Sequence, residues 1–361
     1  MTELTGKERI SRILNHQPVD RIGLYEHFWG DTQKEWMTNQ GCGEDLTKEF
    51  NFDMVELWAF KMVARVDFEP VVIKEDEDTV TKLDGNWAVL RRHKKHDSTP
   101  EHIRYEIDSR EKWEEKIKPL LLDRSLFEKR IKFEEYRAAK KYAAENNKFF
   151  VWSGVNVFEC MHPVAGHEEM LAAMIYDPEW VADMSKTFSW LIVELQKLLF
   201  EREGKPDAIW FYEDMGYKGA PFMSPAMYDQ FIYPSHEYTF NYAHSIGLPV
   251  MVHSCGFVEP LLPGMIKAGM DLLQAMEVKA GMDLLRIYHN YGDKIALMGG
   301  IDARALCSND RAQIDAELEK KIPTVKGKYG YVLHTDHSVP KTVDLENYRY
   351  FVKKGLELGT Y

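Results

Sequence analysis

The residues best suited to chemistry are His253 and Cys255, which directly follow the short apolar run 250–252. Such a run predicts a buried strand. Residues two apart in a strand project from one face, so both side chains can reach one metal ion. Zinc prefers imidazole and thiolate ligands, and a catalytic zinc takes three protein ligands and keeps a fourth position open. The pair therefore supplies two of three ligands, although a His or Cys at a strand end is more often simply packed or hydrogen-bonded.

Eight apolar segments predict the strands that would position this pair. They are residues 22–26, 54–57, 149–152, 208–211, 250–252, 271–274, 295–298 and 331–333. Helical segments are expected between them, at 178–201, 225–245, 258–268 and 310–321, after N-terminal helices at 7–16 and from Thr32. Strands that alternate with helices and are apolar throughout are typical of a parallel sheet covered on both faces. We therefore expect an α/β fold, a (β/α)8 TIM barrel with an N-terminal helical extension; a doubly wound open sheet is the alternative.

Two stretches interrupt the alternation. Residues 68–93 alternate in polarity and contain the turn Asp84-Gly85, which predicts a small antiparallel β-hairpin insertion. Residues 96–147 are highly charged and are predicted to be a mainly helical insertion. Both are expected to belong to one domain that spans residues 1–361.

Composition narrows the range of partners. The 361 residues carry a net charge of −12, which disfavours binding to nucleic acid or to an anionic membrane surface. The four cysteines have no paired spacing, which indicates a reducing compartment. No run of eighteen apolar residues and no export signal occurs, so we expect a cytoplasmic protein without a membrane partner.

In a barrel the chemistry lies where strands end, so the residues after each strand are the candidates for the site. His337 is expected as the third metal ligand, with His334 and Glu213 as competing ligands. A histidine that only caps a loop is the alternative for His337. Aromatic and polar residues at these ends would line the substrate pocket if they face one mouth: His27, Phe28, Trp29, Trp58, Trp152, Tyr212 and Asp302.

Five segments together are typical of one known superfamily. They are Lys7-Glu8-Arg9-Ile10 through His16-Gln17-Pro18-Val19-Asp20-Arg21, Tyr212-Glu213-Asp214-Met215-Gly216, His253-Ser254-Cys255-Gly256, Met298-Gly299-Gly300-Ile301-Asp302, and Gly330-Tyr331-Val332-Leu333 leading into Val339-Pro340. On these segments the chain resembles the uroporphyrinogen decarboxylase superfamily over nearly its whole length. The resemblance implies a TIM barrel, in agreement with the count of strands.

Two branches of that superfamily differ in the segment after the first strand. True uroporphyrinogen decarboxylases carry arginines there that bind the substrate's carboxylates, whereas this chain has Tyr25-Glu26-His27-Phe28-Trp29-Gly30, without an arginine. The other branch, the cobamide-dependent methyltransferases, binds zinc through His-x-Cys and a distant Cys. His253 and Cys255 match the first two positions, and His337 stands where that branch has the third thiolate. Replacing a thiolate by imidazole would make the zinc a stronger Lewis acid.

The resemblance therefore implies a zinc-dependent methyltransferase that moves a methyl group between a small methylated substrate, such as a phenyl methyl ether, and a corrinoid. No cobalamin-binding segment of the type Asp-x-His-x-x-Gly occurs, so the corrinoid (cobalamin) is expected on a partner protein. Glu213 and Asp214 are expected to orient the substrate or to donate a proton to a departing phenolate, or to be a solvated loop pair. A cofactor-free decarboxylase of a small acid and a catalytically silent binding protein are the alternatives.

Overall fold

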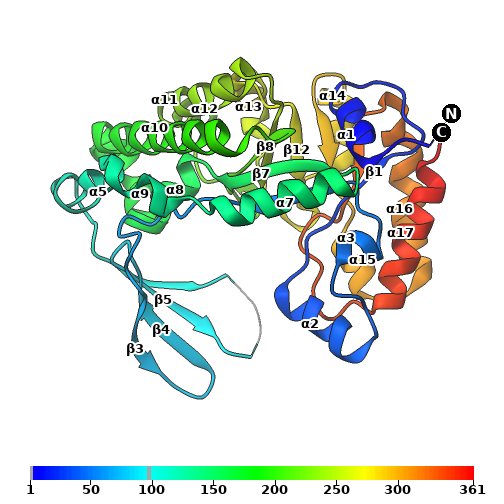
Figure 1. Ribbon diagram of the computed structural model, residues 1–361, viewed down its shortest axis with the longest axis horizontal. Helices are drawn as coiled ribbons and strands as arrows, with labels where there is room; N and C mark the ends of the chain where they lie inside the picture. The colour runs from blue at the N-terminus through cyan, green and yellow to red at the C-terminus, as the bar shows by residue number, and fades with distance from the viewer. Residues whose placement is uncertain (1–2, 96–98) are drawn as a thin grey trace.

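The computed structural model describes residues 3–95 and 99–361, and its centre is a curled sheet of eight parallel strands (Figure 1). The order is β1-β14-β13-β12-β11-β8-β7-β2. The strands are β1 (Gly23–Leu24), β2 (Met54–Trp58), β7 (Phe149–Val155), β8 (Ala208–Tyr212), β11 (Val250–Ser254), β12 (Leu272–Ala275), β13 (Ala296–Met298) and β14 (Tyr331–Leu333). Each lies on a segment predicted as a strand, so the expected barrel fold is confirmed.

The two edge strands, β1 and β2, meet around one buried carboxylate. The amide of Asp53 donates to the carbonyl of Leu24 (2.9 Å), and the amide of Leu24 donates to the Asp53 side chain (2.8 Å). The same side chain forms ion pairs with Arg9 (2.6 Å) and Arg21 (2.8 Å). The Asp53 carboxylate therefore links α1 (Gly6–Leu14) to both edge strands of the sheet. Removing one of its partners would leave a buried charge unpaired, which is strongly destabilising.

Helices cover the outside of the sheet (Figure 1). Those after the second strand include α8 (Val157–Ala165), α9 (His167–Tyr176), α10 (Pro178–Glu203), α13 (Leu262–Ala268), α14 (Leu284–Tyr291), α15 (Ala303–Cys307), α16 (Arg311–Val325) and α17 (Leu345–Gly359). The segment predicted as one helix at 225–245 is two helices, α11 (Pro225–Phe231) and α12 (Tyr233–Ser245). Pro234 explains the break, because proline lacks the amide that would continue the hydrogen bonding of α11.

A separate four-stranded antiparallel sheet projects from the barrel (Figure 1). It consists of β3 (Val71–Glu75), β4 (Thr79–Leu83), β5 (Ala88–His93) and β6 (Glu101–Tyr105). The inserted sheet is larger than the predicted hairpin, since β6 falls in the stretch 96–147 that was predicted to be mainly helical. That stretch begins at residues 96–98, which lie outside the described residues. β6 is a strand because it pairs with β5, from Ala88 opposite Tyr105 to Arg91 opposite Glu101.

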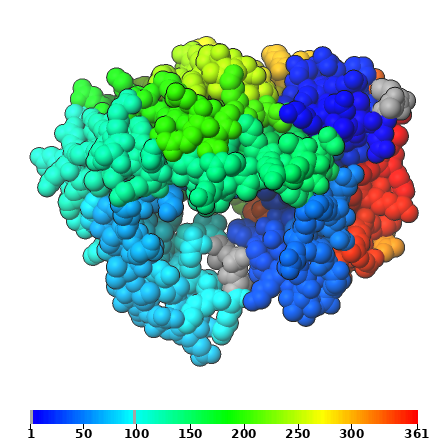
Figure 2. Space-filling model, in the orientation of Figure 1, coloured from blue at the N-terminus to red at the C-terminus, as the bar shows by residue number. Residues whose placement is uncertain are grey.

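The rest of that stretch is helical and returns the chain to the barrel. It contains α4 (Arg110–Lys112), a π-helical turn (Trp113–Ile117), α5 (Lys118–Leu122), α6 (Phe127–Arg130) and α7 (Phe133–Glu145). On the opposite side, α2 (Gly30–Asn39) and α3 (Leu46–Glu49) follow β1. Figure 2 shows that the molecule is hollowed between the inserted sheet and α2. Among the described residues, no helix combines the length and apolar character needed to cross a membrane.

Candidate metal centre and adjoining cavity

Three potential metal ligands converge beyond the ends of β8 and β11. Nε2 of His253 lies 3.3 Å from Sγ of Cys255 and 3.1 Å from Oδ1 of Asp214, and the three ligand atoms all lie within 4.8 Å of one another. His253 and Cys255 share one side, as their spacing predicts. Asp214 joins them because β8 and β11 are adjacent, with His253 in register with Tyr212.

Two glycines allow the loops after these strands to approach each other. Gly256 has a positive φ of 77°, and a Cβ atom there would lie 2.2 Å from the carbonyl carbon of Gly216. Beside this contact the amide of Phe257 donates to the carbonyl of Tyr217 (2.9 Å). A side chain at Gly256 would separate the loops, so the sequence Cys255-Gly256 serves the geometry of the ligand group as well as its chemistry.

The orientation of His253 is set from the neighbouring strand. Its register partner on β12 is Gln274, and Nδ1 of His253 donates a hydrogen bond to Oε1 of Gln274. In the neutral imidazole the lone pair is therefore on Nε2, which faces Asp214 and Cys255. A hydrogen bond to the far nitrogen of a histidine is the usual way in which a protein orients a metal ligand.

The protonation of the group also suits a cation. Burial raises the pKa of the Cys255 thiol, although His253 opposes this shift. Burial disfavours the charged imidazolium of His253, but Cys255 and Asp214 outweigh it and hold the pKa of His253 well above its ordinary value. Protons thus occupy the space where the ligand atoms meet, and a metal ion would replace them. One oxygen, one nitrogen and one sulfur donor form a ligand set that fits zinc.

The structure does not bring His337 into this group. Its ring lies against Trp29, with centroids 5.9 Å apart. The loop is drawn towards β1, because the amide of Val339 donates to the carbonyl of His27 (2.8 Å) and the hydroxyl of Thr335 donates to Glu26 (2.9 Å). Within residues 3–95 and 99–361, the group of possible metal ligands consists of Asp214, His253 and Cys255. Asp214 thus takes the place that the sequence predicted for His337.

Glu213 also has a different position from the one expected. Its side chain is fully buried and accepts hydrogen bonds from the amides of Phe158 (2.8 Å) and Glu159 (3.0 Å) at the start of α8. Nε2 of His236 lies 2.8 Å from the same carboxylate. A carboxylate at a helix N-terminus is stabilised by the free amides and the helix dipole. Glu213 therefore anchors α8 and does not line the cavity described below, whereas its neighbour Asp214 does.

A second polar cluster lies inside the barrel and contains the competing ligand His334. Nε2 of His334 is 3.1 Å from Nδ1 of His27, whose Nε2 is 2.9 Å from the hydroxyl of Tyr212. Tyr212 also donates to Glu56 (3.0 Å). Nδ1 of His334 is 3.1 Å from Oε1 of Glu26. We call these residues, His27, Glu26, Glu56, Tyr212 and His334, the interior cluster.

The other predicted substrate-binding residues separate into different environments. Trp58 packs on Tyr212, with centroids 4.4 Å apart, and Tyr212 in turn lies 4.6 Å from the ring of His253. These three rings form a row that ends at the ligand group, to which His253 belongs. The remaining residues have packing or capping roles: Phe28 lies among Trp36, Phe50, Phe52 and Tyr348, Trp152 is fully buried against Phe60 and Phe211, and Asp302 caps α15.

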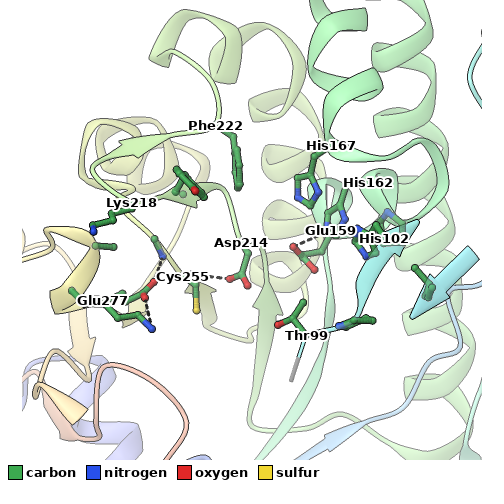
Figure 3. A pocket seen from close by; sticks show the side chains of 18 residues that line it. Thr99, His102, Glu159, His162, His167, Asp214, Lys218, Phe222, Cys255 and Glu277 are labelled. Atoms are coloured by element: carbon green, nitrogen blue, oxygen red, sulfur yellow. Dashed lines mark hydrogen bonds and ion pairs between the residues drawn. The ribbon is translucent and has the colours of Figure 1, made fainter. Parts of the chain in front are cut away.

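A cavity of about 660 Å³ adjoins the ligand group (Figure 3). Asp214 and Cys255 lie between its two sides. Lys218 and Glu277 lie on one side, and His102, Glu159, His162 and His167 on the other, as Figure 3 shows. The residues on this second side come from β6, α8 and α9 and were not predicted. The spacing Glu159-x-x-His162 was an available signal, since residues three apart meet on a helix, and Nε2 of His162 lies 2.9 Å from Glu159.

The histidines of the cavity are uncharged at neutral pH. Burial lowers the pKa of His162 to about 4 and that of His167 to about 3. Burial also lowers the pKa of His102. For Glu159, burial and the nearby charges of Asp214 and Glu213 raise the pKa well above its ordinary value. This side of the cavity therefore carries little charge.

Known proteins resemble the chain mainly through its fold. It aligns with a methyltransferase from Methanosarcina mazei over 98% of this chain and 99% of that one, at 15% identity and a TM-score of 0.69. A Xaa-Pro dipeptidase (14% identity, covering 63% of this chain and 58% of that one) has a TM-score of 0.33. A 3-keto-L-gulonate-6-phosphate decarboxylase from Vibrio cholerae O1 biovar El Tor (10% identity, covering 63% of this chain and 91% of that one) has a TM-score of 0.29. No curated protein sequence matches the chain.

The family comparison is more specific. The model of the uroporphyrinogen decarboxylase (URO-D) family matches residues 150–356, which is more than half of the chain. The matched region runs from β7 to α17 and contains Asp214, His253 and Cys255, while the inserted sheet lies outside it. The expected family is thereby confirmed: the chain belongs to the uroporphyrinogen decarboxylase family.

Proposed function

We propose that the protein is a zinc-dependent methyltransferase that transfers a methyl group between a small methylated substrate and the corrinoid of a partner protein. The observation that carries the proposal is the convergence of Asp214, His253 and Cys255 at a cavity. Membership of the family and the fold shared with a methyltransferase are consistent with it.

Each residue of the ligand group has a defined part in this proposal. Asp214, His253 and Cys255 would hold zinc, with Asp214 in the place first expected for His337. When bound, zinc supplies Lewis acidity to the heteroatom that carries the methyl group. Gln274 keeps Nε2 of His253 directed at the metal position. The cavity beside the group holds the substrate and keeps it next to the ligands.

The lining of the cavity favours a small substrate over a tetrapyrrole. A porphyrinogen carries many carboxylates and needs several cationic partners, preferably arginines. Among the described residues, the side chains that line the cavity include two lysines, Lys218 and Lys279, and no arginine. Lys279 is already paired with Glu277 (3.2 Å). We therefore propose a small methylated compound, with a phenyl methyl ether as the leading donor class.

The proposal is tested by metal analysis together with an assay of methyl transfer. We expect purified protein to contain about one zinc per chain, and Cys255→Ser to lose both the metal and the methylation of a corrinoid protein. The matched control is Cys307→Ser, since Cys307 lies on α15, outside the ligand group. Wild-type protein that is free of zinc, with Cys255→Ser unchanged in transfer, would contradict the proposal. A product decarboxylated without metal would instead support a decarboxylase.

A further inference from the structure

We infer that the side of the cavity formed by His102, His162, His167 and Phe222 is the binding site for a flat, uncharged aromatic ring of the methyl donor. We call these four residues the ring wall. The inference rests on the proposed function for the methyl transfer itself, but ring binding can be measured without any transfer. It assigns the specificity for the substrate to residues outside the metal ligand group.

The ring wall is a continuous set of neighbouring rings, in which His167 stacks on His162 and His102 and is tilted against Phe222. The rings of His162 and His167 are nearly parallel, with centroids 4.0 Å apart and an interplanar angle of 23°. The ring of Phe222 lies 5.1 Å from His167, and that of His102 lies 6.2 Å from His167 at an angle of 20°. Planar faces at these separations are those that a further aromatic ring stacks against. Figure 3 shows Phe222, His162 and His167 grouped beside Asp214.

The size of the cavity favours a ring over a one-carbon donor. A volume of about 660 Å³ lies within the range of about 300–1,000 Å³ that is typical of pockets for small organic ligands. Methanol or methylamine would leave most of this space to water. A phenyl methyl ether would fill more of it than either, and it could lie against the ring wall with its methoxy group towards Asp214 and Cys255, which line the same cavity.

The charges at the cavity disfavour a methylated cation. A quaternary ammonium ion is held by electron-rich aromatic faces or by free carboxylates. Phe222 is the one phenyl ring of the ring wall, and Tyr217, which also lines the cavity, is 67% exposed. The carboxylates have partners already: Asp214 accepts the amide of Cys255 (2.7 Å), and Glu277 accepts the amide of Gly256 (2.7 Å) and pairs with Lys279. The low pKa values of His162 and His167 keep their rings neutral, which suits an uncharged ring.

One atom of the ring wall also lacks a partner. Nδ1 of His162 is buried, in a residue that is 8% exposed, and forms no hydrogen bond with any described residue. Its other nitrogen is bound to Glu159 (2.9 Å). A buried polar atom without a partner costs about 1–3 kcal/mol. Nδ1 is too deeply buried to meet a ligand in the cavity, so the ring of His162 is held in place by its bond to Glu159 and its stacking on His167.

One member of the ring wall comes from outside the region matched by the family, while His162, His167 and Phe222 lie within it. His102 belongs to β6 of the inserted sheet, which lies outside the region matched by the family. Leu90, Thr99 and Pro100 of the same insertion line the cavity with it. The insertion thus supplies part of the wall that faces the ligand group of the barrel.

Calorimetric titration of the full-length protein tests the inference. We expect 2-methoxyphenol and phenol to bind, and methanol and tetramethylammonium not to compete with them. Phe222→Leu, which keeps apolar volume but removes the ring, and His167→Ala should each weaken binding of 2-methoxyphenol about tenfold. Tyr176→Ala is the control, because Tyr176 is an exposed aromatic residue on α9, 58% accessible and outside the cavity.

The outcomes separate this inference from the proposed function. Ring binding that persists in Cys255→Ser, while zinc and transfer are lost, supports both. Ring binding without any methyl transfer in the wild-type protein supports the ring site and contradicts the proposed function. Transfer from methanol without ring binding contradicts the ring site alone. Competition by tetramethylammonium that Phe222→Leu abolishes would identify a cation site and overturn the inference.

Discussion

The ligand group of Asp214, His253 and Cys255 and the interior cluster around His334 use similar residues in opposite ways. Both combine histidine with carboxylate, and Gln274 lies between them, bonded to His253 and 3.4 Å from Nε2 of His334. In the interior cluster each side chain is paired with another side chain or with the backbone. In the ligand group the donor atoms point at one another and at a cavity.

This difference separates a structural cluster from a functional one. Burial lowers the pKa of His334 well below its ordinary value, so its ring is neutral and packed. Burial disfavours the charged ring of His253, but the acidic neighbours Cys255 and Asp214 outweigh it and hold the pKa of His253 well above its ordinary value. Groups that have a strongly shifted pKa and also face a cavity are the stronger candidates for function.

Replacing one histidine from each cluster should give the largest contrast. We expect His253→Ala to lower zinc affinity by more than a hundredfold and to destabilise the metal-free protein less than His334→Ala does, because His253 lies beside the cavity and water can replace its ring. His334→Ala should do the reverse, with a loss of about 2–4 kcal/mol from a cavity and unpaired buried groups. Metal titrations and urea unfolding measure both. Equal losses of zinc affinity in the two variants would contradict the distinction between the ligand group and the interior cluster.

The link between the clusters should give a smaller effect. Gln274→Leu removes the acceptor that orients His253, and we expect zinc affinity to fall ten- to a hundredfold, as is usual for such partners of metal ligands. Gln274→Glu keeps an acceptor and is the matched control, with affinity near that of the wild type. Metal competition with a chromogenic chelator measures the change, and an unchanged affinity in Gln274→Leu would show that Gln274 does not position the ligand.

The pH dependence of the interior cluster should give the smallest effect. Burial raises the pKa of Glu26 from 4.5 to about 8, against the hydrogen bonds from Thr335 and His27 that lower it. Since the folded state binds this proton more tightly, the stabilisation is complete below pH 4.5 and is lost as the pH rises through 8. Relative to Glu26→Gln, the wild type should lose up to about 1.4 kcal/mol per pH unit in that window. Urea unfolding between pH 5 and 8 measures this loss.

The exposed carboxylate Glu168 offers the comparison for that experiment. Glu168→Gln should follow the wild-type curve at every pH, because this substitution leaves Glu26 and its buried surroundings unchanged. Parallel curves for the wild type and Glu26→Gln would show that Glu26 is ionised in the folded protein.

Local patterns were sufficient for most of the barrel. Apolar runs such as 250–252 and 208–211 became β11 and β8 because strands buried on both faces need continuous hydrophobic residues. The inserted sheet was only partly predicted, since β6 depends on pairing with β5, a contact between segments separated in the chain. Pro234 was a local signal for the break between α11 and α12. The helical periodicity of residues 225–245 nevertheless favoured the prediction of one continuous helix.

The sequence by itself determined the family, the eight parallel strands, and the shared direction of His253 and Cys255, because each depends on local composition or spacing. Only the tertiary structure decided the third member of the group. The adjacency of β8 and β11 brings in Asp214, while the hydrogen bonds of the loop after β14 draw His337 towards Trp29. It also decided that Glu213 caps α8 and that His102, His162 and His167 meet at one cavity. Those positions depend on contacts between distant segments, which no spacing along the chain records.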